Sequence, residues 1–118
     1  MESHAILFDQ LEWQSPQAGA RFKLFREGSK QVRLLELSPE FVESHWCEKG
    51  HVGFVVEGEL EIDFSGHFVR FPQCSALMIP AGAAHAHKAR AVTSLVRLFL
   101  VEEVSAGEVK CRIRITQP

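Results

Sequence analysis

The chain lacks an excess of charge, a long apolar run and a cysteine-rich pattern, and each absence narrows its class. The net charge at pH 7 is -2 and the basic residues are scattered, so nothing in the charge pattern points to nucleic acid as a partner. No segment approaches the roughly 20 apolar residues of a membrane helix, and no basic N-terminal stretch precedes an apolar run. We therefore expect neither a membrane span nor a signal peptide. Three cysteines at unrelated spacings argue against a disulfide framework, which favours a cytoplasmic protein with reduced thiols.

Helical periodicity is nearly absent as well. Short apolar runs recur between Gly, Pro and Ser residues instead, which is the pattern of a β-sandwich or barrel. With 118 residues, 46% of them hydrophobic, the chain has the size and composition of one domain with a buried core. The N-terminal arm, residues 1–20, fits a loose segment, an additional edge strand or a dimer contact. The predicted strands cover residues 22–25, 32–37, 52–56, 60–64, 67–71, 76–79, 85–88, 94–101 and 109–115.

One predicted hairpin indicates which way a histidine points. Glu57-Gly58 is a candidate two-residue turn, because glycine adopts the positive φ that such turns require. A hairpin closed there places six residues on one face, namely His51, Gly53, Val55, Leu60, Ile62 and Phe64. Because this face is largely apolar it should point inward, and His51 with it. A titratable side chain aimed at a core needs a partner. A second turn is predicted at Ser65-Gly66.

Two motifs rich in histidine are spaced to meet across a small barrel. The first is His45-x-Cys47-x-x-x-His51, and the second is the stretch Pro-Ala-Gly-Ala-Ala-His that ends at His85. Imidazole nitrogen binds Zn, Fe, Ni or Cu, and a thiolate favours Zn or Fe. The sequence therefore predicts a metal-centred pocket, with a metal-free pocket lined by histidines as the alternative.

These motifs resemble those of small single-domain cupins, which are double-stranded β-helix barrels of the jelly-roll type. The first cupin motif runs His-x-His, three or four residues, Glu, six residues and Gly; here Cys47 replaces the second histidine and His51 the glutamate. The second motif, Pro-x-Gly-x-x-His, is matched in full, although Cys74 stands at the glycine that usually opens it. The resemblance covers about residues 30–101. It implies an all-β, RmlC-like jelly-roll barrel.

Carried over position by position, the resemblance implies a metal site made of His45, Cys47, His51 and His85. The metal would be a divalent transition ion such as Zn, Fe, Ni or Mn. Whether Cys47 binds it stays open: a bound thiolate closes the site, whereas a three-histidine site leaves positions for water or substrate. Four further residues are expected beside the metal or in the wall of the pocket, namely His87, Phe64, Val55 and Ile62. Three more charged residues lie on strands from which they could reach a pocket, namely Arg33, Glu36 and Arg97.

Three classes of function remain open for such a protein. The resemblance permits a metal-dependent enzyme, such as a non-haem oxygenase or an isomerase, in which an open coordination position acts on a small substrate. The alternatives are a binding or sensing module for a small ligand and a barrel with a purely structural metal. No residue apart from the ligands can be assigned a catalytic role. Cupins of this size are commonly homodimers, and Trp13, Phe22 and Phe25 suggest an apolar surface that needs cover, so we expect a homodimer.

Overall fold

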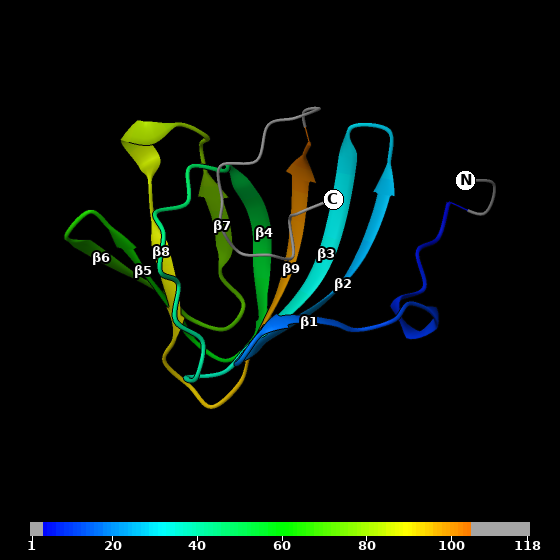
Figure 1. The fold of residues 1–118 in the computed structure, drawn as a ribbon, viewed down its shortest axis with the longest axis horizontal. Coiled ribbons are helices and arrows are strands. Elements are labelled where there is room, and N and C mark those ends of the chain that lie inside the picture. Colours follow the sequence, from blue (N-terminus) through cyan, green and yellow to red (C-terminus); the bar gives the residue numbers. More distant parts are fainter. Residues whose placement is uncertain (1–3, 105–118) are drawn as a thin grey trace.

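The computed structural model describes residues 4–104, and these residues form an almost entirely β structure (Figure 1). The described part contains nine strands, two short 3-10 helices and no α-helix, which confirms the predicted all-β class. The predicted strand 109–115 lies outside the described residues. The 3-10 helices are η1 (Phe8–Gln10) and η2 (Ala83–His85). The strands are β1 (Gln14–Gln17), β2 (Ala20–Glu27), β3 (Lys30–Leu37), β4 (His51–Glu57), β5 (Leu60–Phe64), β6 (His67–Phe71), β7 (Ala76–Ile79), β8 (Lys88–Ala91) and β9 (Val96–Glu103).

The strands form two antiparallel sheets. The larger sheet has the order β1-β2-β3-β9-β4-β7, and the smaller sheet has the order β6-β5-β8. The hydrogen-bonded ladders do not join the two sheets into a closed barrel. The apolar core lies between them and takes side chains from both, such as Leu35 and Leu98 from the larger sheet and Leu60 and Ile62 from the smaller one.

Strand alternation places a polar group at one end of this core. On β3 the inward positions run Gln31, Arg33, Leu35 and Leu37, and all four are buried. On β9 the buried positions alternate in the same way and end at Glu102, which is paired in register with Gln31. The end of the sandwich at which β9 finishes is therefore polar inside, while the rest of the core is apolar. This polar end is where the candidate site lies.

The predicted hairpin between residues 51–55 and 60–64 is wrong. β4 pairs with β9 and β7, whereas β5 pairs with β6 and β8, so Gly58 leads the chain from one sheet to the other. Its φ is +82°, and a Cβ there would lie 2.0 Å from the carbonyl oxygen of Leu95, so only glycine fits this corner. The inward orientation expected of His51 is nevertheless correct, because the facing sheets share one core.

Other local predictions had mixed outcomes. The turn at Ser65-Gly66 is confirmed: its two φ angles are +56° and +100°, as a type I′ hairpin requires, and it joins β5 to β6. The predicted strand 85–88 is wrong, because η2 ends at His85 and β8 begins only at Lys88. Of the possibilities for the N-terminal arm, the structure shows an edge strand, β1, paired with β2.

The apolar surface differs from the predicted one. Phe22 is 2% exposed and belongs to the core, and the ring of Trp13 is covered by the guanidinium of Arg21 at 3.9 Å from its centroid. The exposed large apolar side chains of the larger sheet lie instead on the outer face of β4, β7 and β9. They are Val52, Phe54, Val56, Met78 and Val101.

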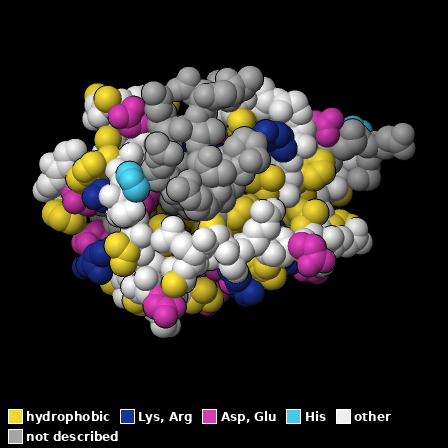
Figure 2. Space-filling view, in the orientation of Figure 1, with side chains coloured by type: hydrophobic (Ala, Val, Ile, Leu, Met, Phe, Trp, Pro, Cys, Tyr) yellow, Lys and Arg dark blue, Asp and Glu magenta, His cyan; other side chains and the backbone are white. Residues whose placement is uncertain are grey.

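Charged side chains of both signs lie on the described surface (Figure 2). On the face shown in Figure 2, acidic and basic side chains of the described residues are interspersed, and no cluster of one sign is seen there. Neither Cys47 nor Cys74 forms a disulfide within the described residues. No helix in residues 4–104 is long and apolar enough to cross a membrane.

Candidate metal centre

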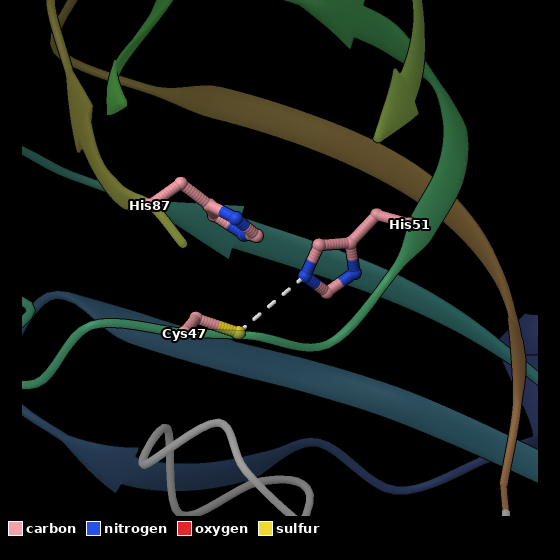
Figure 3. A group of neighbouring side chains, drawn as sticks. All are labelled: Cys47, His51 and His87. Atoms are coloured by element: carbon pink, nitrogen blue, oxygen red, sulfur yellow. Dashed lines mark hydrogen bonds between the residues drawn. The ribbon is translucent and has the colours of Figure 1, made fainter. Parts of the chain in front are cut away.

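Three buried side chains, Cys47, His51 and His87, converge where β4 begins (Figure 3). One potential ligand atom from each lies within 4.8 Å of the other two. Cys47 Sγ is 3.8 Å from His51 Nε2, and the centroids of the two imidazole rings are 5.1 Å apart. The convergence comes from segments that are far apart in the sequence.

The backbone holds two of these residues side by side. Cys47 N donates to the carbonyl of His87 at 2.8 Å, and His87 N donates to the carbonyl of Cys47 at 2.9 Å. This isolated antiparallel bridge fastens the loop before β4 to the segment before β8. Since His51 is the first residue of β4, all three side chains are anchored by sheet or bridge hydrogen bonds rather than carried by a free loop.

A buried carboxylate sets the tautomer of His51. Glu102 Oε2 lies 2.9 Å from His51 Nδ1. Burial by itself would raise the pKa of Glu102, but the charge of Arg33 and the hydrogen bond from His51 lower it well below the usual range. An ionised carboxylate only accepts hydrogen bonds, so Nδ1 carries the proton and Nε2 turns its lone pair toward Cys47. A carboxylate placed in this way is the common support of a metal-binding histidine.

Glu102 is in turn held by several donors. Arg33 donates from Nε to Oε1 at 3.0 Å and from Nη2 to Oε2 at 2.6 Å, which is a bidentate pair. Gln31 donates to Oε1 at 2.8 Å, and Lys49 Nζ lies 3.6 Å from the same oxygen. The side chains of Arg33 and Glu102 are completely buried. These contacts fix the orientation of the carboxylate, and its hydrogen bond to Nδ1 in turn fixes the orientation of the His51 ring.

His87 is oriented by a backbone carbonyl instead of a carboxylate. Its Nδ1 lies 2.9 Å from the carbonyl oxygen of His85, which can only accept, so Nε2 again has the free lone pair. Burial lowers the pKa of His87 to about 4, and the hydrogen bond to His85 offsets only part of this effect. Burial also lowers the pKa of His51, against the opposing influence of Glu102. Both imidazoles are thus neutral at pH 7, which is the form that binds metals.

The structure groups only part of the predicted ligand set. Cys47 and His51 are together, but His45 and His85 have exposed side chains outside the cluster, and His45 Nδ1 lies 3.0 Å from the hydroxyl of Ser44. Residues two apart would share a face on a strand, but outside the bridge residue Cys47 this segment is not a strand, so His45 does not follow Cys47 into the cluster. His85 lies in a helical turn, so its side chain and that of His87 diverge, and its carbonyl alone reaches the cluster.

The residues expected around the metal also have definite places. His87, expected in the pocket wall, is a member of the cluster. The centroid of the Phe64 ring lies 5.9 Å from the centroid of the His87 ring. Ile62 lines the cavity described below, while Val55 is buried in the core. Of the charged residues considered, Arg33 reaches the site. Two others, Glu36 and Arg97, pair with each other elsewhere at 2.6 Å.

Sequence reasoning missed Glu102, although a signal for it was present. Leu98, Leu100 and Glu102 occupy alternate positions of one strand, so the two leucines that point inward predict an inward carboxylate. A buried carboxylate needs a cation, and Arg33 stands at an inward position of the neighbouring strand β3. That pairing was not recognised, because it depends on which strands are neighbours.

A cavity adjoins the cluster between the two sheets. It has about 430 Å³ of empty volume, including its opening to solvent. Most of its wall is aliphatic and comes from inward leucines and isoleucines of both sheets. Four lining residues carry charged or titratable groups, namely Arg33, Glu43, His51 and His87.

The donor set fits a transition metal ion. A tetrahedral zinc ion would hold a sulfur and a nitrogen ligand about 3.5 Å apart, given bond lengths of about 2.3 Å and 2.0 to 2.1 Å. The distance of 3.8 Å between Cys47 Sγ and His51 Nε2 is close to this separation. Two neutral imidazoles with fixed tautomers and one thiol provide three ligands, so a fourth position remains for a further ligand.

The chain sequence matches no protein-family model and no curated protein. Its structure, in contrast, is similar to many solved structures. The structure of KdgF from Halomonas sp. is 20% identical over 85% of this chain and 94% of that one, with a TM-score of 0.68. A sugar phosphate isomerase of the cupin superfamily from Silicibacter pomeroyi is 15% identical over 86% and 76% of the two chains, with a TM-score of 0.70. An RmlC-like cupin from Shewanella frigidimarina is 15% identical over 88% and 93%, with a TM-score of 0.67.

These likenesses define the fold. The chain has the jelly-roll fold of a small cupin domain, as its two motifs predicted. The identities are low, so the likeness concerns the fold, and the chemistry has to be argued from the residues of this chain.

Proposed function

We propose that this protein binds a divalent transition metal through Cys47, His51 and His87 and receives a small molecule in the adjoining cavity. The observation that carries the proposal is the convergence of three buried donor atoms within 4.8 Å, two of them on imidazoles whose other nitrogen is already bonded. A metal ion bound there would take all three donor atoms at once, with the Cys47 thiol deprotonated and its contact with His51 Nε2 replaced by bonds to the metal.

The donor chemistry narrows the choice of metal. One sulfur and two imidazole nitrogens favour zinc or iron among the ions considered. Manganese prefers carboxylate and water oxygens, and the cluster contains no carboxylate. We therefore expect zinc or iron and rank manganese last.

In such a centre the metal, the hydrogen-bond partners of the two histidines and the cavity wall would each have a separate role. A bound metal would supply Lewis acidity at its open position. Glu102 keeps Nδ1 of His51 protonated, and the carbonyl of His85 does the same for His87, so both Nε2 atoms stay available. The mostly aliphatic walls give the cavity a lower dielectric constant than water, which strengthens electrostatic contacts inside it. This arrangement supports metal-assisted chemistry on a small ligand, with isomerase and oxygenase as the reaction classes to be tested.

One observation favours a structural metal as the second candidate. Cys47 has no exposed surface, and a fully buried thiolate ligand is typical of closed structural sites. The two candidates differ in coordination number. A centre completed by water or a small molecule supports the first, and a centre completed by a fourth protein ligand supports the second.

The metal content of substituted proteins tests the site. His87→Ala and Cys47→Ser, purified without an affinity tag, should each lose most of the bound metal. His45→Ala and His85→Ala are matched controls, because they remove exposed histidines of the same two motifs, and they should retain it. Retention in His87→Ala together with loss in His45→Ala or His85→Ala would contradict the proposed ligand set.

A further inference from the structure

The cavity beside the candidate metal centre contains a buried cation with an unused donor. Arg33 has no exposed surface, and its Nε and Nη2 atoms donate to Glu102. Its Nη1 is buried without a hydrogen-bond partner, and no other buried side-chain nitrogen or oxygen of residues 4–104 has been found in this state. Leaving a donor of a charged group without an acceptor costs free energy. An acceptor that enters the cavity would therefore gain more from Arg33 than from a donor that is already satisfied.

The position of this donor connects it to the candidate metal centre. Arg33, His51 and His87 all line the same cavity. Arg33 and His51 also contact the same oxygen, Oε2 of Glu102, at 2.6 and 2.9 Å. A small molecule that reaches Nη1 of Arg33 is thus bound next to the imidazole proposed to hold the metal.

The rest of the cavity wall is unsuited to a ligand rich in hydroxyl groups. Among residues 4–104, no serine, threonine, tyrosine, asparagine or glutamine side chain lines it. Sugar hydroxyls buried there would lose their hydrogen bonds to water without replacement, which is unfavourable. An aliphatic or aromatic body would instead pack against Leu35, Leu60, Ile62, Leu77, Leu98 and Leu100.

We propose that the ligand of this cavity is a small carboxylate with an apolar body, and that its carboxylate accepts a hydrogen bond from Arg33 Nη1. The inference rests on the small-molecule part of the proposed function and names its substrate class. A carboxylate matches a guanidinium edge in shape and charge. A phosphate dianion would bring a second negative charge beside Glu102, which already pairs with the single charge of Arg33. The enclosed part of the cavity has only about 40 Å³, which restricts the apolar body to a short chain of a few carbons.

Calorimetric titration of the metal-free wild-type protein tests the class of ligand directly. Butyrate should bind, whereas butyramide, which has the shape of butyrate without its charge, should bind at least tenfold more weakly. Glucuronate and ribose 5-phosphate should also bind at least tenfold more weakly than butyrate. Equal affinities for butyrate and butyramide would overturn the role of Arg33. A preference for glucuronate or ribose 5-phosphate would overturn the apolar body.

A substitution then tests the residue. Arg33→Lys keeps a cation opposite Glu102 but removes Nη1, so the affinity for butyrate should fall at least tenfold while the far-ultraviolet circular dichroism stays that of the wild type. Arg21→Lys is the matched control: Arg21 also pairs with a buried glutamate, Glu36, but does not line the cavity, and its butyrate affinity should not change. An unchanged affinity in a folded Arg33→Lys protein would contradict the inference.

A second readout keeps the inference testable if Arg33→Lys does not fold. In wild-type protein labelled with nitrogen-15, the side-chain Nε–H resonance of Arg33 should move on titration with butyrate and stay in place with butyramide. No movement with excess butyrate would overturn the inference. Metal binding is measured separately by equilibrium dialysis. If the protein takes up metal but does not bind butyrate, the carboxylate proposal is refuted and the metal proposal stands. If it binds butyrate but takes up no metal, the metal proposal is refuted and the carboxylate proposal stands.

Discussion

His51 and Glu102 form a buried hydrogen bond of 2.9 Å between Nδ1 of the imidazole and Oε2 of the carboxylate. It joins the last inward position of β9 to the first residue of β4, strands that are neighbours in the sheet. Since an ionised carboxylate can only accept, the bond keeps the proton on Nδ1 and leaves Nε2 for a ligand. Glu102 is therefore a positioning residue of the candidate metal centre, although its sequence position is far from both cupin motifs.

Glu102→Gln should lower the affinity for zinc by about 10- to 100-fold, because an amide can face Nδ1 with either its oxygen or its nitrogen and carries no charge. A competition titration against a chromophoric chelator measures this affinity. Glu36→Gln is the matched control: Glu36 is also a buried carboxylate held by arginines, but it lies away from the cavity. Equal losses in the two proteins would show that Glu102 acts through general stability and not through His51.

The stability of the metal-free protein should depend on the charge of His87. Its pKa is about 4 in the folded state, below the ordinary value of 6.5, so the unfolded chain takes up the proton first as the pH falls. The contribution of His87 is fully present above about pH 6.5 and is lost as the pH falls toward 4, amounting to about 3 kcal/mol of unfolding free energy. Urea denaturation in the presence of a chelator between pH 7.5 and 4 measures the loss, and His87→Gln should reduce it. A wild-type unfolding free energy that stays constant over this range would contradict the assignment.

Gly58 should tolerate a side chain much less well than Gly66, the other glycine with positive φ at an end of β5. Gly58→Ala and Gly66→Ala both place alanine at positive φ, which costs about 1 kcal/mol. At Gly66 a Cβ meets nothing within 4 Å, whereas at Gly58 it would lie 2.0 Å from the carbonyl oxygen of Leu95. Thermal unfolding should therefore show a much larger destabilisation for Gly58→Ala. Similar losses would mean that the chain does not change sheets at this corner in the way described.

We further predict a homodimer, formed through the outer face of β4, β7 and β9 rather than through the N-terminal segment. β7 is an edge strand, and exposed apolar side chains lie next to it on this face, so two copies related by a twofold axis could cover the same patch. Light scattering of the wild type should give twice the monomer mass, and Met78→Glu together with Phe54→Glu should give the monomer mass. Trp13→Ala is the control and should remain dimeric. A monomeric wild type across a wide concentration range would contradict this prediction.

Strand alternation explains how much of the fold could be predicted. The positions of Leu60, Ile62 and His51 on the inner side follow from the period of two, and that period is independent of which strands pair. The pairing itself was predicted wrongly at Gly58, because a Glu-Gly dipeptide fits both a hairpin turn and a corner between sheets. What decides between them is the close approach of Leu95, a contact distant in sequence.

The same distinction applies to the site. Cys47 and His51 were recognised from their spacing, but that spacing also suggested His45, on the assumption of a continuous strand that the chain does not form there. The motif that ends at His85 identified the second segment, but a helical turn there leaves His85 exposed, and the buried imidazole is that of His87. Local patterns thus identified the segments of the site, and tertiary hydrogen bonds selected the side chains.

X-ray absorption at the metal edge of zinc-loaded protein reports directly on the proposed ligands. We expect one sulfur neighbour at about 2.3 Å and two imidazole nitrogens at 2.0 to 2.1 Å, with the sulfur lost in Cys47→Ser and one imidazole lost in His87→Ala. His45→Ala and His85→Ala should leave the spectrum unchanged. A first shell without sulfur, or one that loses an imidazole in His45→Ala or His85→Ala and none in His87→Ala, would contradict the account.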